Sequence, residues 1–192
     1  MNYIKNGNQE VVMGSGDLYA IPVKEIADVF NLTEAEEAKL TYLGYIEANS
    51  VLKSEIEKEP LKSANAGLVG EFIKEKTNTF QTGIFSWNLE NISNFLTGST
   101  YTVDETTGKT IFSYAHEDKS PNVYLRFVST DEAAKKKIVV NMFTCAFNGE
   151  LNFDFNLEKP VTFDYAFTII AQLKPSTGKH VYYEVSVEDL ED

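Results

Sequence analysis

Hydrophobic and polar residues alternate through much of the second half of the chain. At 151–157, Leu and Phe occupy every second position, and Asn or Asp lies between them. The same period of two recurs at 123–127, 161–169 and 181–187. Successive side chains of a β-strand point to opposite faces, so each of these segments is predicted to be a strand with one buried face.

A tight turn is predicted at Asn148-Gly149, between a β-rich run at 138–147 and the strand at 151–157. Asn-Gly readily adopts the positive φ angles of a two-residue hairpin turn. We therefore expect these two segments to pair as an antiparallel hairpin.

Further elements are predicted upstream of this hairpin. The expected strands and strand pairs lie at 68–76, at 79–87, and at 101–114 with a turn near Thr107-Gly108. The expected helical segments are few and short, at 23–30, 33–40, 89–96 and 131–137. Thr33 and Glu36 have the spacing of a capping box. No linker divides the chain, so we expect one mainly β domain over 1–192, a β-sandwich or barrel.

The composition narrows the class of protein. Acidic residues number 29 and basic residues 17, a formal net charge of −12. Such a surface repels phosphate backbones, which argues against a nucleic-acid-binding protein. A single Cys excludes an intramolecular disulfide. No apolar run approaches the roughly 18 residues of a membrane span, and the first residues lack the apolar core of a signal peptide. We expect a soluble protein made inside the cell.

The sequence offers little that suggests catalysis. His116 and His180 have no second ligand at metal-binding spacing, and Cys145 lies alone within a predicted strand, as a core residue does. The Gly-Lys pairs at 108–109 and 178–179 lack the earlier glycine of a phosphate-binding loop. We therefore predict no catalytic residue, cofactor or metal, and we expect a protein that is not an enzyme.

The polar stretch from Ala48 to Asn65 is predicted to be a solvated loop. It is rich in Lys, Glu, Ser and Asn, and Glu55, Glu57 and Glu59 do not fit a calcium-binding pattern. Such a loop is expected to be disordered in an isolated monomer and ordered on assembly. The strands elsewhere have few charges or prolines to protect their edges, so the barrel closes on itself, helices cover the edges, or the edges pair with other copies.

The order of several motifs resembles a known family. Gly14-Ser15-Gly16-Asp17-Leu18-Tyr19 is followed by Tyr42-Leu43-Gly44-Tyr45-Ile46. A Gly-rich strand at 66–70, a Thr/Phe-rich strand at 79–81 and the helix-like segment 89–96 come next. This succession resembles the major tail proteins, or tail tube proteins, of long-tailed bacteriophages.

The resemblance implies a β-sandwich or barrel flanked by a short helix. Copies would assemble into hexameric rings that stack into a hollow tube in the virion, enclosing the tape-measure protein and conducting DNA without binding it specifically. Tail terminator and baseplate proteins would be further partners. The segment at about 47–67 would be a hairpin arm reaching a neighbouring subunit, and 184–192 an acidic tail. The matching motifs supply the expected assembly interface: Gly14, Gly16, Leu18, Tyr19, Tyr42, Gly44, Tyr45 and Ile46.

A second hypothesis needs no assembly. A monomeric β-sandwich could bind a sugar or a peptide through exposed aromatic side chains. It predicts a row of such side chains on one face, whereas tube assembly predicts that the stretch at 48–65 is protected only in the polymer.

Overall fold

Antiparallel strands make up most of the protein, as the sequence predicts. A computed structural model describes residues 16–46, 50–63, 65, 67–84, 90, 93, 99–113, 121–131, 134–154 and 162–190. The strands of the main sheet are β1 (Asp17–Pro22), β2 (Thr41–Tyr45), β3 (Val51–Ser63), β4 (Gly67–Ile84), β7 (Val123–Asp131), β8 (Lys136–Asp154), β9 (Thr162–Ile169) and β12 (Tyr183–Asp189). Two separate hairpins are β5 (Thr100–Asp104) with β6 (Lys109–Ser113), and β10 (Gln172–Lys174) with β11 (Lys179–Val181).

The main sheet is strongly curved but is not a closed barrel. Its strands follow the order β2-β1-β7-β8-β9-β4-β3, and β12 pairs with β8. The strand β2 approaches β4 through an isolated bridge between Ile46 and Ile84. No ladder joins β2 to β4 in the described chain. The prediction of a closed barrel, one of the two architectures expected from the sequence, is therefore wrong.

The inner face of the curved sheet holds the main hydrophobic core. Its side chains come from β1, β2, β4, β7, β8 and β9 and include Leu18, Leu43, Phe80, Leu125, Phe127, Val140, Met142, Tyr165 and Phe167. All of these side chains are less than 8% exposed. The alternation in the sequence places them on one face, and burial of that face stabilises the fold.

The segment between β1 and β2 covers part of the outer face. Phe30 and other apolar residues of this segment pack on Ile21, Tyr124 and Phe143, a second and smaller core. The helix predicted at 33–40 is present as α1 (Glu34–Glu37), and the one predicted at 23–30 is the short 3-10 helix η1 (Val23–Glu25).

A capping box fixes the start of α1, as the sequence predicts. The Glu36 backbone N–H donates to Thr33 Oγ1 at 3.3 Å, and the Thr33 N–H donates to Glu36 Oε2 at 2.8 Å. A further bond from the Ala27 N–H to Glu36 Oε1 spans 2.7 Å. These backbone donors hold the pKa of Glu36 below its ordinary value.

The predicted hairpin at Asn148-Gly149 is wrong. Both halves belong to the single strand β8, and β9 pairs with it on either side of a register shift between Phe147 and Leu151. Asn148 lies in this irregular stretch, where its Oδ1 accepts a hydrogen bond from Thr168 Oγ1 at 3.0 Å. Pairing along β9 therefore overrides the local turn preference of Asn-Gly.

Three other predictions need correction. The polar stretch at 48–65 is not a loop over 51–63, where it forms β3. The acidic tail at 184–192 is the edge strand β12 over 184–189. The helix expected at 131–137 is absent from its described residues, because they end β7, form a turn and begin β8. The helix predicted at 89–96 lies largely outside the described residues.

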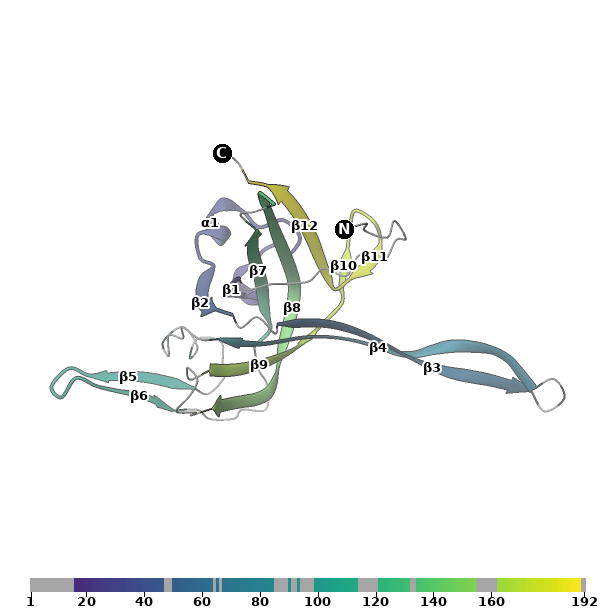
Figure 1. Cartoon of the computed structure of the whole chain (residues 1–192), viewed down its shortest axis with the longest axis horizontal. Coiled ribbons are helices and arrows are strands. Elements are labelled where there is room, and N and C mark those ends of the chain that lie inside the picture. Colours follow the sequence, from purple (N-terminus) through teal and green to yellow (C-terminus); the bar gives the residue numbers. More distant parts are fainter. Residues whose placement is uncertain are drawn as a thin grey trace.

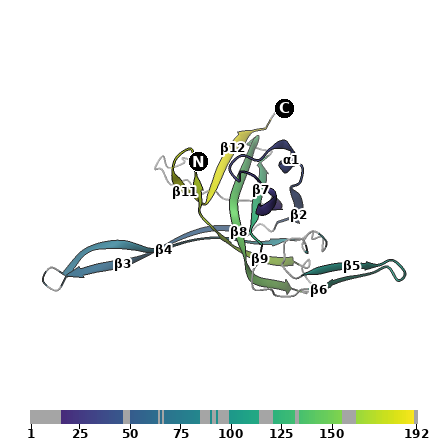
Figure 2. The same cartoon turned by 180° about the vertical axis from the view of Figure 1, so that it is seen from behind.

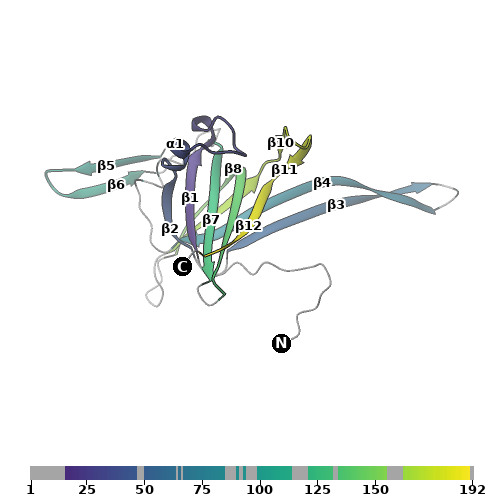
Figure 3. The same ribbon diagram turned by 90° about the horizontal axis from the view of Figure 1, so that it is seen from above.

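Two hairpins project from opposite sides of the curved sheet. Figure 1 shows the β3–β4 hairpin extending far to one side and the shorter β5–β6 hairpin extending to the other. The same arrangement is visible from behind in Figure 2 and from above in Figure 3. The hairpin predicted at 101–114 is confirmed, with its turn ending at Gly108, which has a φ of 67°.

Candidate assembly surfaces

The longer projection, here called the arm, consists of residues 51–63 of β3 and 67–78 of β4. The two strands pair along their whole length in this region. Pairing of β4 with β9 begins only at Thr79 and continues toward Ile84. Over residues 54–62 and 68–76, no third described strand pairs with the arm, so this part is a two-stranded ribbon with both faces in solvent.

The arm exposes many large apolar side chains. Seven of them are between 48% and 62% exposed: Val51 at the base of the arm, and six beyond the base, namely Ile56, Leu61, Leu68, Val69, Phe72 and Ile73. Isolated two-stranded hairpins are at best marginally stable in water, and contiguous exposed apolar surface is typical of an interaction site. The arm therefore has the composition of a surface that another molecule covers.

Ion pairs lie across and along the arm. Lys58 Nζ is 3.4 Å from a Glu71 oxygen, and Lys74 Nζ is 2.7 Å from Glu57. All four of these side chains are more than half exposed. Exposed pairs of this kind contribute little stability, typically about 0–1 kcal/mol each. They therefore do not replace the missing hydrophobic support.

The β5–β6 hairpin is a second exposed projection. Val103 and Ile111 are large apolar side chains in solvent on this hairpin. Hydrogen bonds stabilise its turn: Asp104 accepts from the Thr107 hydroxyl at 2.6 Å and from the Thr106 N–H at 2.9 Å. These bonds lower the pKa of Asp104.

The structure places the predicted interface residues in β1, in β2 and beside them. The Leu18 and Ile46 side chains are buried in the core of the single chain, so they are not available to a partner. Gly16 lies against β7, where a Cβ would come within 2.4 Å of the Val128 oxygen. Its lack of a side chain therefore serves packing within the chain.

Four further predicted residues, Tyr19, Tyr42, Gly44 and Tyr45, lie in the edge strand β2 or in its neighbour β1. The rings of Tyr19 and Tyr42 pack together with their centroids 5.5 Å apart, and the Tyr42 hydroxyl donates to Asp17 Oδ1 at 3.2 Å. Gly44 has a φ of 137°, which favours glycine. Tyr45 lies in β2 but its side chain is not described, and Gly14 lies outside the described residues. Tyr42, Gly44 and Tyr45 thus lie in the edge strand β2, and Tyr19 lies in the neighbouring strand β1. The apolar surface of the arm was not among the predicted interface residues.

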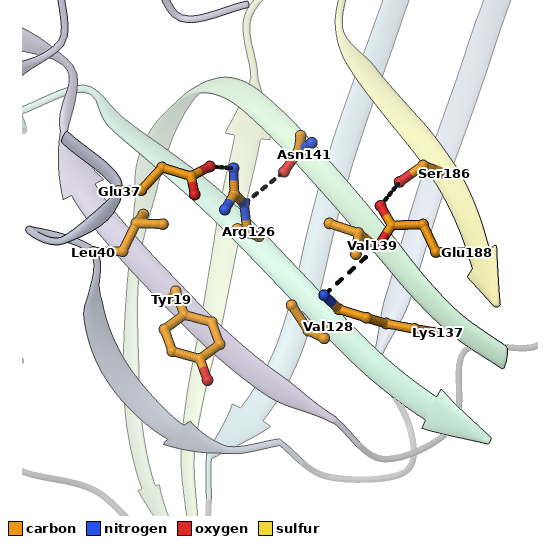
Figure 4. A pocket seen from close by; sticks show the side chains of 10 residues that line it. All are labelled: Tyr19, Glu37, Leu40, Arg126, Val128, Lys137, Val139, Asn141, Ser186 and Glu188. Carbon is orange, nitrogen blue, oxygen red and sulfur yellow. Dashed lines mark hydrogen bonds and ion pairs between the residues drawn. The ribbon is translucent and has the colours of Figure 1, made fainter. Parts of the chain in front are cut away.

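An open groove lies on the part of the outer face that residues 23–40 leave uncovered. Its volume is about 550 Å³. Figure 4 shows its lining side chains, which come from β1, α1 and its following turn, β7, β8 and β12: Tyr19, Glu37, Leu40, Arg126, Val128, Lys137, Val139, Asn141, Ser186 and Glu188.

The charged side chains of this groove bond to one another. Arg126 donates to Glu37 Oε1 at 2.8 Å and to Asn141 Oδ1 at 2.9 Å. Lys137 Nζ lies 3.7 Å from a Glu188 oxygen. The groove is thus a polar surface of balanced charge, with hydrogen-bonding groups around the Tyr19 ring.

The described residues contain little that resembles a reactive centre. Cys145 is fully buried in the core, and this burial raises the pKa of its thiol. Among the described residues, no three His, Cys, Asp or Glu side chains are grouped to hold a metal ion. No helix in this part of the chain is long and apolar enough to cross a membrane.

No model of a protein family matches the chain, and no curated protein matches its sequence.

Proposed function

We propose that this protein is the structural subunit of a tube, of the kind that forms the tail of long-tailed bacteriophages. The single observation that carries the proposal is the arm: a ribbon that extends beyond the sheet and exposes six large apolar side chains. Exposure of these apolar side chains to water is unfavourable. A second copy that covers the ribbon removes them from water and so stabilises the assembly.

The placement of the two hairpins supports assembly in one direction. The arm and the β5–β6 hairpin extend from opposite sides of the sheet. When the hairpin on one side of a copy contacts the next copy, we expect the two copies to use different surfaces in that contact. Such heterologous contacts produce rings when the rotation closes and filaments when it does not. Pairing between sheet edges such as β2 and β12 would add backbone hydrogen bonds between subunits.

The resemblance in sequence supplies the finer part of the proposal. Under it, the fold is that of a tail tube protein, six copies form each ring, and stacked rings in the virion enclose the tape-measure protein. The protein is then not an enzyme and needs no cofactor. Its net charge of −12 gives the tube a wall that repels DNA. At physiological salt this repulsion extends only about 8 Å from the wall, so it prevents DNA from sticking without blocking its passage.

Electron microscopy of the purified chain at high concentration tests this proposal. We expect rings or tubes for the wild-type chain, and their loss in an Ile73→Asp variant of the arm. Leu173→Asp is the matched control, because Leu173 is also exposed but lies in β10, outside the arm. Monodisperse particles of the wild-type chain at all salt concentrations would contradict the proposal.

The groove of Figure 4 favours one alternative function. Its polar side chains and the Tyr19 ring are of the types that bind sugars or peptides. A monomeric binding module would remain monodisperse in the microscope, and soluble oligosaccharides or peptides would perturb the fluorescence or NMR signals of Tyr19. Assembly without any such ligand effect would exclude this alternative.

A further inference from the structure

The register of the arm gives it two chemically different faces. Residues of β3 alternate between the faces, and each residue shares its face with its partner on β4. One face, here called the basic face, carries Ser54, Ile56, Lys58, Pro60 and Lys62 with Asn78, Lys76, Ile73, Glu71 and Leu68. The other, the acidic face, carries Lys53, Glu55, Glu57, Glu59 and Leu61 with Thr79, Thr77, Glu75, Phe72 and Gly70.

Charges that are not neutralised within the arm have opposite signs on these faces. On the basic face, the pair formed by Lys58 and Glu71 leaves Lys62 and Lys76 without an ion pair among the described residues. On the acidic face, Lys53 lies 2.6 Å from Glu55, and Lys74, the extra residue at a register shift, pairs with Glu57. Among the described residues, no lysine forms an ion pair with Glu59 or Glu75 on this face.

Apolar side chains accompany both sets of charges. Ile56, Leu68 and Ile73 lie on the basic face, and Leu61 and Phe72 lie on the acidic face. The arm as a whole has five lysines and five glutamates, so it is neutral in a chain whose net charge is −12. Two arms can therefore approach one another without the repulsion that acts between the acidic bodies.

The edges of the arm are poorly suited to adding a further strand. Pro60 removes a backbone donor from β3. On β4, register shifts leave Val69 and Lys74 without a partner on β3, and such bulges disrupt the regular row of backbone groups. The faces, not the edges, are thus the surfaces left for a partner.

We propose that the arms of successive copies stack, with the basic face of one arm on the acidic face of the next. This inference rests on the proposed function and names the partner of the arm. Packed sheets lie about 10 Å apart, a separation that apolar side chains from two facing ribbons fill. The face that carries Lys62 and Lys76 in one copy then lies opposite the face that carries Glu59 and Glu75 in another, and the apolar residues of both faces are removed from water.

Charge reversal on each face, followed by mixing, tests this stacking in the full-length chain. One variant carries Lys62→Glu and Lys76→Glu, so that both of its faces are acidic. The other carries Glu59→Lys and Glu75→Lys, so that both of its faces are basic. We expect each variant alone to associate roughly tenfold more weakly than the wild-type chain or worse, because like charges meet.

In a mixture, every contact between a copy of one variant and a copy of the other joins an acidic face to a basic face. An equimolar mixture is therefore expected to regain wild-type assembly in sedimentation velocity and electron microscopy. A control with Lys24→Glu and Lys179→Glu has the same change in net charge as the first variant, outside the arm, and should assemble normally. Circular dichroism checks that every variant is folded.

The outcomes separate this inference from the proposed function. Wild-type assembly by either variant alone, or failure of the mixture to regain assembly while the wild-type chain forms tubes, would overturn arm stacking. In the second case the arm binds the body of another copy. A wild-type chain that never assembles would overturn the proposed function itself, and arm stacking with it.

Discussion

Side chains alternate between two faces both in the body of the sheet and in the arm, but apolar side chains are buried in the body and exposed in the arm. In the body, the apolar side of β4 faces five other strands, and Phe80 is completely buried. Along the same strand in the arm, Phe72 is about half exposed (48%) because no other element faces it. The difference shows that the strand itself does not decide burial; the presence of a second layer does.

Replacing these two phenylalanines gives the largest expected contrast. Phe80→Ala should lower the free energy of unfolding by about 3–5 kcal/mol, since it empties a closely packed core. Phe72→Ala should change it by about 0.5 kcal/mol or less, since the side chain is in solvent. Denaturant unfolding of the dispersed protein measures both changes. Similar losses for the two variants would show that the arm packs against its own body in solution.

Two glycines provide the next contrast. At Gly16 a new Cβ would lie 2.4 Å from the Val128 oxygen and 2.6 Å from the Phe127 ring. Gly16→Ala should therefore lower the free energy of unfolding by about 1–3 kcal/mol. At Gly70, in the arm, nothing lies within 4 Å of such a Cβ. Gly70→Ala should therefore leave stability unchanged or raise it by up to about 1 kcal/mol. Thermal unfolding of both variants tests this, and a normal melting temperature for Gly16→Ala would contradict it.

Acid should affect the body through Glu36. The folded state lowers the pKa of Glu36 from its ordinary value of 4.5, chiefly through hydrogen bonds from Thr33 and Ala27. Its stabilising effect is therefore complete above pH 4.5 and is lost as the pH falls through the lowered pKa. Glu36→Gln should destabilise the protein at neutral pH, and this difference should shrink in acid.

The arm offers a matched carboxylate for this pH experiment. Glu59 is exposed and has no ion pair among the described residues, so Glu59→Gln removes a carboxylate without removing such a contact and serves as the control. Urea unfolding between pH 7 and pH 3 measures all three proteins. A Glu36→Gln difference that stays constant down to pH 3 would show that the charge of Glu36 does not stabilise the fold.

The smallest effect is expected for an ion pair of the arm. Lys74→Gln removes the contact with Glu57, in which both side chains are more than half exposed. Because solvent screens such pairs, the free energy of unfolding of the dispersed protein should change by about 0.5 kcal/mol or less. A larger loss would mean that the ribbon is held by electrostatics and needs no apolar partner.

The sequence predicts those elements whose stability is local or whose alternation is regular. The capping box of Thr33 and Glu36 needs only contacts within one turn, and the strands at 123–127 and 161–169 have a clear apolar face. Asn148-Gly149 misled because a local turn preference says nothing about β9, which pairs across it. Long-range pairing of this kind leaves no signal in a short window.

The β3 half of the arm was missed as a strand for a different physical reason, whereas the strand predicted at 68–76 is present within β4. A ribbon with both faces in solvent needs no apolar face, so 51–63 lacks the alternation of a half-buried strand. A signal was present in another form: Glu55, Glu57 and Glu59 occupy odd positions, whereas Ile56, Lys58 and Lys62 occupy even ones. Alternation of charge, not of hydrophobicity, would have predicted the strand and its two faces.

The central claim is that another copy covers the arm on assembly, and labelling of a single cysteine in the arm tests it most directly. Ile73→Cys places a thiol on an exposed position of the basic face, while the native Cys145 is buried and should not react in the folded protein. The account predicts rapid modification of residue 73 by a thiol reagent in the dispersed protein and strong protection in assembled material. Equal rates of modification in both states would contradict it.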